Sequence, residues 1–261
     1  MATLFFIFYL NFWFSLLLWL PARHCQYELK TRDGFLIVSL FWIVICIFAA
    51  IPFGLSFDTT VGLTDPLFEA ISGFTTTGAT VISNIEKLPY ALLYYRQQLQ
   101  FIGGMGIIVL AVAILPMLGV GGMQLYRAET PGPMKDNKLT PRITESAKAL
   151  WLIYLGLTLI CILCFYLAGM TLFEAIGETF GTISTGGFSL HSSSFSYYNS
   201  TTIEMIACVF MILSSINFSL HFVALQRRTL RHYRRDEELK FFIMMLLLSC
   251  LFISITLLVH N

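Results

Sequence analysis

Two short runs of threonine, serine and glycine interrupt the long apolar stretches of this chain. The first is SGFTTTGATV (72–81) and the second is TISTGGFS (182–189). Threonine and serine supply hydroxyl oxygens, and glycine lets main-chain carbonyls turn in directions that a Cβ atom would forbid. Carbonyl and hydroxyl oxygens together can replace the water shell of a monovalent cation. The two runs therefore predict a cation site that is built largely from the main chain.

The elements around these runs have the composition of a membrane protein. Of 261 residues, 57% are hydrophobic and only 12% are charged, whereas soluble domains are about 45–50% apolar and about 25% charged. A helix needs about twenty apolar residues to cross the hydrocarbon core. Six windows satisfy this requirement: 1–20, 35–54, 99–119, 149–168, 202–225 and 241–259. We therefore expect an all-α integral membrane fold with six spans.

Intramembrane catalysis is disfavoured by the same windows. Acid–base or covalent chemistry requires paired ionisable or nucleophilic groups. No Asp, Glu, Lys or Arg lies well inside any window, and His221 has no acidic neighbour in its own. Cys161 and Cys164 form a Cys-x-x-Cys pair, but they lie mid-window without ligand-type neighbours, so we interpret them as small hydrophobic residues. We expect no enzyme activity and no covalently bound cofactor.

Charge is distributed unevenly between the connecting segments. Three segments carry most of the basic residues: Arg23, Lys30 and Arg32; Arg127, Lys135, Lys138, Arg142 and Lys148; and Arg227, Arg228, Arg231, Arg234, Arg235 and Lys240. The positive-inside rule places these segments in the cytoplasm and both termini on the outer, periplasmic side. The outer segments are acidic, which either gathers cations at a vestibule or only reflects the avoidance of Lys and Arg.

An internal repeat contains both threonine–glycine runs. DPLFEAISGFTTTGATV (65–81) lines up with MTLFEAIGETFGTISTGGFS (170–189) through a shared Leu-Phe-Glu-Ala-Ile, with three extra residues before the second run. Each segment predicts a helix of about ten residues, which reaches only halfway into the bilayer, followed by an extended loop. Asp65 and Pro66 predict the first helix start, and Thr171-x-x-Glu174 has the form of a capping box. Backbone at this depth is tolerated only where protein or water covers it, so the loops are expected to line a hydrated path.

The repeats divide the chain into five parts. We predict a leading transmembrane helix with a cytoplasmic link (1–34), a first membrane–pore helix–membrane repeat (35–119) and a cytoplasmic loop (120–148). A second pore repeat (149–225) follows. The last part is a cytoplasmic loop and the first helix of an incomplete third repeat (226–261).

Three separated motifs closely resemble the TrkH family, the membrane subunits of bacterial Trk potassium uptake systems in the Trk/Ktr/HKT superfamily. They are LFEAISGFTTTGATV, the inner loop GGMQLYRAETPGPMKDNKLTPRITESAKALWLIY, and TISTGGFS. The resemblance runs from about residue 30 to the end. It implies a bacterial inner-membrane pore of four such repeats, in which carbonyls of four filter loops bind K⁺. The filter residues that it assigns here are Thr75, Thr76, Thr77, Gly78, Ala79, Ser184, Thr185, Gly186 and Gly187.

The resemblance also implies partners. Family members form dimers and work with TrkA, a cytosolic nucleotide-binding ring that gates them. This chain departs from the family because it shows one leading helix instead of two, and because most of the third and fourth repeats are missing, including the family's glycine-rich gating loop. Two filter loops cannot surround an ion. In order of preference we expect a truncated or half-length member, a transporter split over two chains, or a homodimer that completes itself. The expected function is potassium uptake with help from the missing repeats, and the alternative is a non-conducting fragment or accessory subunit.

Several other residues carry open alternatives. Gly103, Gly104 and Gly106 predict close helix packing. Arg96 can neutralise Glu69 or Glu86, or extend to the lipid headgroups. Polar residues make window 202–225 suited either to lining a pathway or to hydrogen bonding between helices: Ser214, Ser215, Asn217, Ser219 and His221. The arginines from Arg227 to Arg235 predict a lipid anchor and, by family analogy, a docking point for a cytosolic regulator.

Overall fold

The computed structural model describes residues 20, 31–56, 62, 64–118 and 143–260 of the chain. Every regular element in these residues is helical, as the sequence predicts. The predicted leading span and the basic inner segment around 119–142 lie outside the described residues. The chain divides into two compact units, Met1–Ser215 and Ile216–Asn261.

The first unit contains six α-helices in its described part. They are α2 (Thr31–Ser56), α3 (Thr64–Phe74), α4 (Tyr90–Leu118), α6 (Ile143–Leu167), α7 (Leu172–Ile183) and α8 (Thr201–Ser215). Two short 3-10 helices, η1 (Ile85–Lys87) and η4 (Ser194–Tyr198), lie in the connections. The second unit contains α9 (Phe218–Arg227), α10 (Arg231–Arg235) and α11 (Glu237–His260).

Three of the predicted spans are confirmed as long apolar helices. Within the described residues, the segments that are long and apolar enough to cross a membrane are Ser39–Ser56 of α2, Lys148–Leu167 of α6 and Glu237–Val259 of α11. One face of α2 is apolar and exposed. Leu40, Ile43 and Ile47 follow the helical spacing on this face and are each more than half exposed, which suits contact with lipid and not with water.

The window 99–119 corresponds to α4, but the helix differs from the prediction in two ways. It begins at Tyr90, just after Pro89, whose carbonyl accepts hydrogen bonds from Leu92 and Leu93. It is also interrupted at Gly106, where φ is 33° and ψ is −113°. A left-handed φ is readily adopted by glycine. Gly106 therefore bends the helix, which close packing alone did not predict.

The window 202–225 is not one continuous helix. Helix α8 ends at Ser215 and α9 begins at Phe218, so the helix is interrupted within the window. Within the second unit, His221 Nδ1 lies 2.8 Å from the Tyr233 hydroxyl and joins α9 to α10. This contact supports the hydrogen-bonding interpretation of His221.

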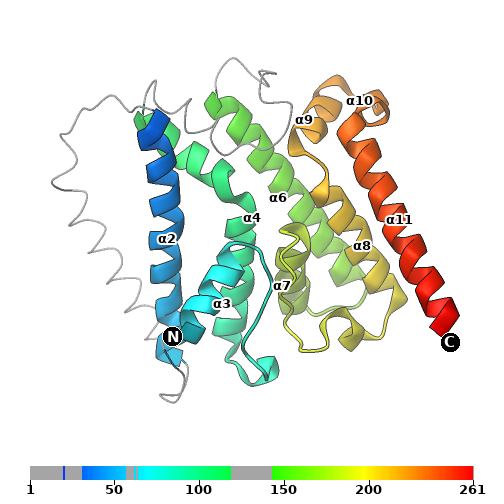
Figure 1. Ribbon diagram of the computed structural model, residues 1–261, viewed down its shortest axis with the longest axis horizontal. Helices are drawn as coiled ribbons and strands as arrows, with labels where there is room; N and C mark the ends of the chain where they lie inside the picture. Colours follow the sequence, from blue (N-terminus) through cyan, green and yellow to red (C-terminus); the bar gives the residue numbers. More distant parts are fainter. Residues whose placement is uncertain (1–19, 21–30, 57–61, 63, 119–142, 261) are drawn as a thin grey trace. The chain divides into compact units, whose positions relative to one another are not determined.

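The core of the first unit places α4 between the two short helices. Helix α3 packs against α2 and α4, and α7 packs against α4 and α6 (Figure 1). Apolar side chains of α2, α3 and α4 form one buried cluster: Cys46, Ala49, Phe53, Ala70, Phe74, Leu92 and Leu99. Because α4 contacts both short helices, it can hold the loops that follow them.

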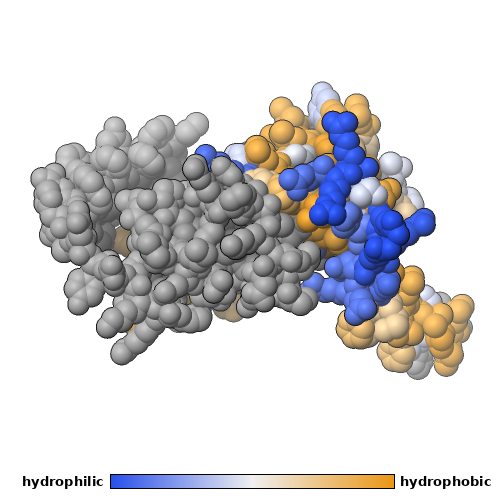
Figure 2. All heavy atoms as spheres, turned by 90° about the horizontal axis from the view of Figure 1, so that it is seen from above, coloured by the Kyte–Doolittle hydropathy of each residue, from blue (hydrophilic) through white to orange (hydrophobic). Residues whose placement is uncertain are grey.

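The second unit carries a cluster of exposed basic residues. Its members lie at the end of α9 and in α10: Arg227, Arg228, Arg231, Arg234 and Arg235. Figure 2 shows a strongly hydrophilic area beside apolar surface on the face that it draws. Such a boundary fits the predicted contact with anionic lipid headgroups.

Candidate functional site

Helices α3 and α7 each end in a non-helical loop, and the two loops have the same backbone design. The amides of Thr75, Thr76 and Thr77 donate to the carbonyls of Ile71, Gly73 and Ser72. In the second loop, the amides of Ser184, Thr185 and Gly186 donate to the carbonyls of Phe180, Thr182 and Gly181 in the same order. Positive φ angles follow at Thr76 (55°) and Gly78 (75°), and at Thr185 (52°) and Gly187 (86°). Two segments that are far apart in the sequence therefore adopt the same backbone conformation.

This pattern corrects the alignment that the shared Leu-Phe-Glu-Ala-Ile suggests. The loops match when Glu69 is paired with Glu178, and not with Glu174. Glu69 accepts hydrogen bonds from Thr80 Oγ1 (2.9 Å) and the Val81 amide (3.3 Å). Glu178 accepts them from Ser189 Oγ (2.6 Å) and the Leu190 amide (2.9 Å). A buried carboxylate in each short helix thus holds the segment that leaves its loop.

Glu174 instead caps the start of α7, which explains why the shared motif pairs it wrongly with Glu69. Its carboxylate accepts from the Thr171 amide at 3.0 Å, and its own amide donates to Thr171 Oγ1 at 3.4 Å. The predicted capping box is therefore confirmed. The expected N-cap of the other helix is wrong, because α3 begins at Thr64 and Asp65 lies in its first turn.

The two loops lie directly against each other. A Cβ atom on Gly78 would lie 2.1 Å from the carbonyl oxygen of Gly186 and 3.2 Å from the Cα of Gly187. The first distance is too short for any Cβ atom and the second is tight, so only glycine permits this approach of the two main chains. The loops also follow the C-terminal ends of α3 and α7, where helix dipoles concentrate negative partial charge.

The predicted site residues differ in exposure. Thr75, Thr77 and Ala79 are exposed in the first loop, and Thr185 and Gly187 in the second; Thr76 and Gly78 are half-buried, whereas Ser184 and Gly186 are buried. Several hydroxyls already serve the turns: Thr75 Oγ1 donates to the Ile71 carbonyl (2.7 Å) and Thr185 Oγ1 to the Ser184 carbonyl (2.7 Å). The hydroxyls thus stabilise the loop backbones in addition to offering oxygen lone pairs.

Arg96 of α4 connects to the first loop through Glu69. Its Nη2 lies 2.8 Å and its Nε 2.9 Å from Glu69 Oε1, and both side chains are fully buried. Nη2 also donates to Thr80 Oγ1 at 3.3 Å. Of the three predicted roles for Arg96, neutralisation of Glu69 is the one observed.

Glu86, the other predicted partner of Arg96, instead joins the two connections that follow the loops. Its carboxylate accepts hydrogen bonds from the Ser192 amide (2.8 Å) and the Ser192 hydroxyl (2.7 Å). These bonds favour the charged form and lower the pKa of Glu86 to about 2. At neutral pH this carboxylate is a structural link between the segments after the two loops.

Sequence reasoning missed a residue of the site. Gln100 of α4 is fully buried beside the second loop, and its side chain accepts a hydrogen bond from the Phe188 amide. A signal was present in the spacing, because positions 96, 100, 103 and 104 share one helix face. The glycines on this face confirm close packing: a Cβ on Gly103 would lie 1.8 Å from the Phe74 carbonyl oxygen.

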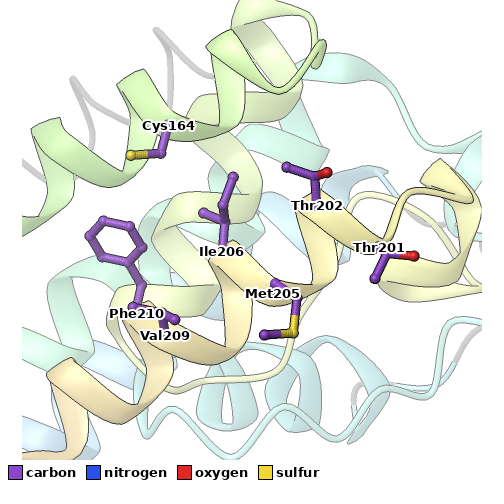
Figure 3. A pocket seen from close by; sticks show the side chains of 7 residues that line it. All are labelled: Cys164, Thr201, Thr202, Met205, Ile206, Val209 and Phe210. Atoms are coloured by element: carbon purple, nitrogen blue, oxygen red, sulfur yellow. The ribbon is translucent and has the colours of Figure 1, made fainter.

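Helix α8 presents an apolar groove. Met205, Ile206 and Val209 line it together with Thr201, Thr202, Phe210 and Cys164 of α6, and its volume is about 540 Å³ (Figure 3). Met205 and Val209 are about half exposed. This apolar face of α8 is thus uncovered by the described residues.

Comparison with known proteins gives consistent matches. The family model TrkH, described as cation transport protein, matches residues 2–260. The chain is 56% identical over 230 residues to the Trk system potassium uptake protein TrkH of Halomonas elongata, covering 88% of this chain and 48% of that protein. It is 53% identical over 245 residues to TrkH of Salmonella typhimurium, covering 94% and 51%. The crystal structure of the potassium transporter TrkH from Vibrio parahaemolyticus superposes with a TM-score of 0.79 at 46% identity, over 95% of this chain and 50% of that one. The chain therefore spans about half the length of these relatives.

Proposed function

Because this chain belongs to the TrkH family of cation transport proteins, we propose that it forms half of a potassium uptake pore in the bacterial inner membrane. Thr75–Ala79 and Ser184–Gly187 are two of the filter loops, and their main-chain oxygens take the place of water around K⁺. The observation that carries the proposal is the direct contact between Gly78 and Gly186, which brings the two loops to one place.

The helix order supports the proposed repeats. Helices α2, α3 and α4 form the first membrane–pore helix–membrane repeat, and α6, α7 and α8 form the second. Helix α11 is the first span of a third. The repeated hydrogen bonds of Glu69 and Glu178 support this division, because each short helix fastens its own loop in the same manner.

Completion of the pore requires further repeats, for which a TrkH-like segment or a second copy of this chain is the proposed source. The groove of Met205, Ile206 and Val209 on α8 supports this requirement, because it is an apolar surface that the described residues leave uncovered. A TrkA-like nucleotide-binding ring is the proposed cytosolic partner, with the arginines of α9 and α10 on the side that it would meet.

Uptake of ⁸⁶Rb⁺ by a bacterium that lacks its own potassium uptake systems tests the proposal. The chain is expressed alone and together with a segment that supplies two further pore repeats. Uptake by the chain alone supports a self-completing assembly, and uptake only in the pair supports a split transporter. No uptake in either case, with both proteins present in the membrane, supports the alternative of a non-conducting fragment and overturns the proposal.

A further inference from the structure

Helix α4 carries a row of polar side chains with no contact to water. Arg96, Gln97 and Gln100 are each 0% exposed. Burial of polar groups is costly unless they make hydrogen bonds. The bond to Glu69 offsets the burial of Arg96 within the first repeat. It does not offset the burial of Gln100.

The partners of Gln100 lie in the other repeat. Its Oε1 accepts a hydrogen bond from the Phe188 amide at 3.1 Å. One helical turn earlier, Arg96 Nη1 donates to the carbonyl of Ser189 at 3.4 Å, and the Arg96 guanidinium carbon lies 4.1 Å from the centre of the Phe188 ring. Two side chains of α4 thus hold the amide of one residue and the carbonyl of the next, directly after the second loop.

Gln100 also packs against the loop itself. A Cβ atom on Gly186 would lie 2.5 Å from the Gln100 side-chain carbon Cδ. The Gln100 side chain therefore leaves no space for a side chain at Gly186. Displacement of the main chain at 186–188 toward α4 is blocked as long as this side chain is present.

We propose that Gln100 is a positioning residue for the second filter loop, so that the ion preference of this loop depends on a side chain of the first repeat. The hydrogen bond to Phe188 and the contact with Gly186 fix the direction of the adjacent carbonyl groups. Selectivity by carbonyl oxygens depends on the number and placement of these dipoles. The inference rests on the proposed pore function, because only an ion site gives the orientation of these carbonyls a consequence.

The test compares three single variants. Gln100→Met keeps the length of the side chain but removes the acceptor. Gln100→Glu restores an oxygen at the same position. Gln98→Met is the matched control, because Gln98 lies on the same helix and is only half-buried.

The first readout is hydrogen–deuterium exchange of the protein in lipid nanodiscs. For Gln100→Met we expect exchange at 184–190 to rise about 3- to 10-fold, the effect of one lost hydrogen bond, with no change at 75–81. Gln100→Glu is expected to restore protection, and Gln98→Met to leave both segments unchanged. Unchanged exchange at 184–190 in Gln100→Met overturns the positioning role, whether or not the chain conducts.

The second readout is ion preference in the assembly that takes up ⁸⁶Rb⁺. It is the Na⁺ concentration that halves ⁸⁶Rb⁺ uptake divided by the K⁺ concentration that halves ⁸⁶Rb⁺ uptake. We expect this ratio to fall about 3- to 10-fold in Gln100→Met and to stay unchanged in Gln98→Met. If Gln100→Met reduces uptake but leaves the ratio unchanged, the role of Gln100 is purely structural. That result would overturn the inference. Absence of wild-type uptake would instead count against the proposed function, and the exchange measurement would still decide the placement of the loop.

Discussion

The Arg96–Glu69 pair is a fully buried ion pair beside the proposed filter. Removing two charges from water costs several kcal/mol, which close pairing and additional hydrogen bonds must offset. The bonds from Thr80 and Val81 to Glu69 supply this compensation. The pair therefore stabilises the first loop only while both partners are present.

Arg96→Met should lower the free energy of unfolding by about 3–5 kcal/mol, because it leaves the Glu69 carboxylate buried without a counter-charge. The double variant Arg96→Met/Glu69→Gln should lose less, since no isolated charge remains. Thermal or denaturant unfolding in detergent measures both. Equal losses in the single and double variants would show that the charge of Glu69 is not compensated by Arg96.

Glu86 gives a prediction about pH. Its pKa in the folded protein is about 2, below the ordinary value of 4.5. A depressed pKa stabilises the folded state above the ordinary value, and this stabilisation is lost as the pH falls from 4.5 toward 2. Carbon-13 NMR of the Glu86 carboxyl should therefore show a midpoint near pH 2 in the wild type. In Ser192→Ala the midpoint should move upward; a midpoint that stays near pH 2 would mean that the Ser192 hydroxyl does not help to hold the charge.

The Arg96 and Gln100 contacts show what residue types alone can and cannot predict. A single arginine near acidic residues has few possible partners, so its pairing with Glu69 was among the predictions. A glutamine in a helix has no such restriction, because its amide can bond to any neighbour or to water. Its contact with Phe188 depends on how α4 lies against a loop that is distant in the sequence.

At the scale of the elements, the two loops depend on glycine where their main chains meet. Gly78 combines a φ of 75° with the short approach to Gly186. Either feature alone disfavours a side chain, and together they leave no room for one.

Gly78→Ala should therefore destabilise the protein and reduce its preference for K⁺ over Na⁺ in any assembly that takes up ⁸⁶Rb⁺. Gly156→Ala in α6 is the control, because nothing lies within 4 Å of the added Cβ and alanine favours a helix by up to about 1 kcal/mol. Unfolding midpoints and uptake competition measure the two effects. An unchanged ion preference in Gly78→Ala would argue against a filter at this loop.

Local sequence patterns predicted the positions of the helices better than they predicted which residues of the two repeats correspond. Apolar runs identified α2, α6 and α11, and Thr171 with Glu174 identified the start of α7. The same Leu-Phe-Glu-Ala-Ile motif misaligned the acidic residues, since Glu174 caps a helix whereas Glu69 holds a loop. The break at Gly106 and the division between α8 and α9 were missed, because hydropathy averages over a window and does not register where a helix is interrupted.

At the scale of the whole molecule, α8 carries an apolar groove that the described residues leave uncovered. If a further repeat covers the groove, cysteine at Val209 in a background without the six native cysteines should form a cross-link to a chain that supplies the missing repeats. Cysteine at Leu163, an exposed position of α6 outside the groove, should not. Mass analysis after treatment with a short bifunctional reagent measures the products. Similar yields at both positions would show that the groove is not a specific contact.

The central claim is that two main-chain loops, in contact at Gly78 and Gly186, supply half of a K⁺ site. Anomalous diffraction from crystals of the conducting assembly grown with Tl⁺, a scattering substitute for K⁺, tests it most directly. The account predicts an anomalous peak at coordination distance from carbonyl oxygens of both Thr75–Ala79 and Ser184–Gly187. Thallium density that contacts neither loop would contradict it.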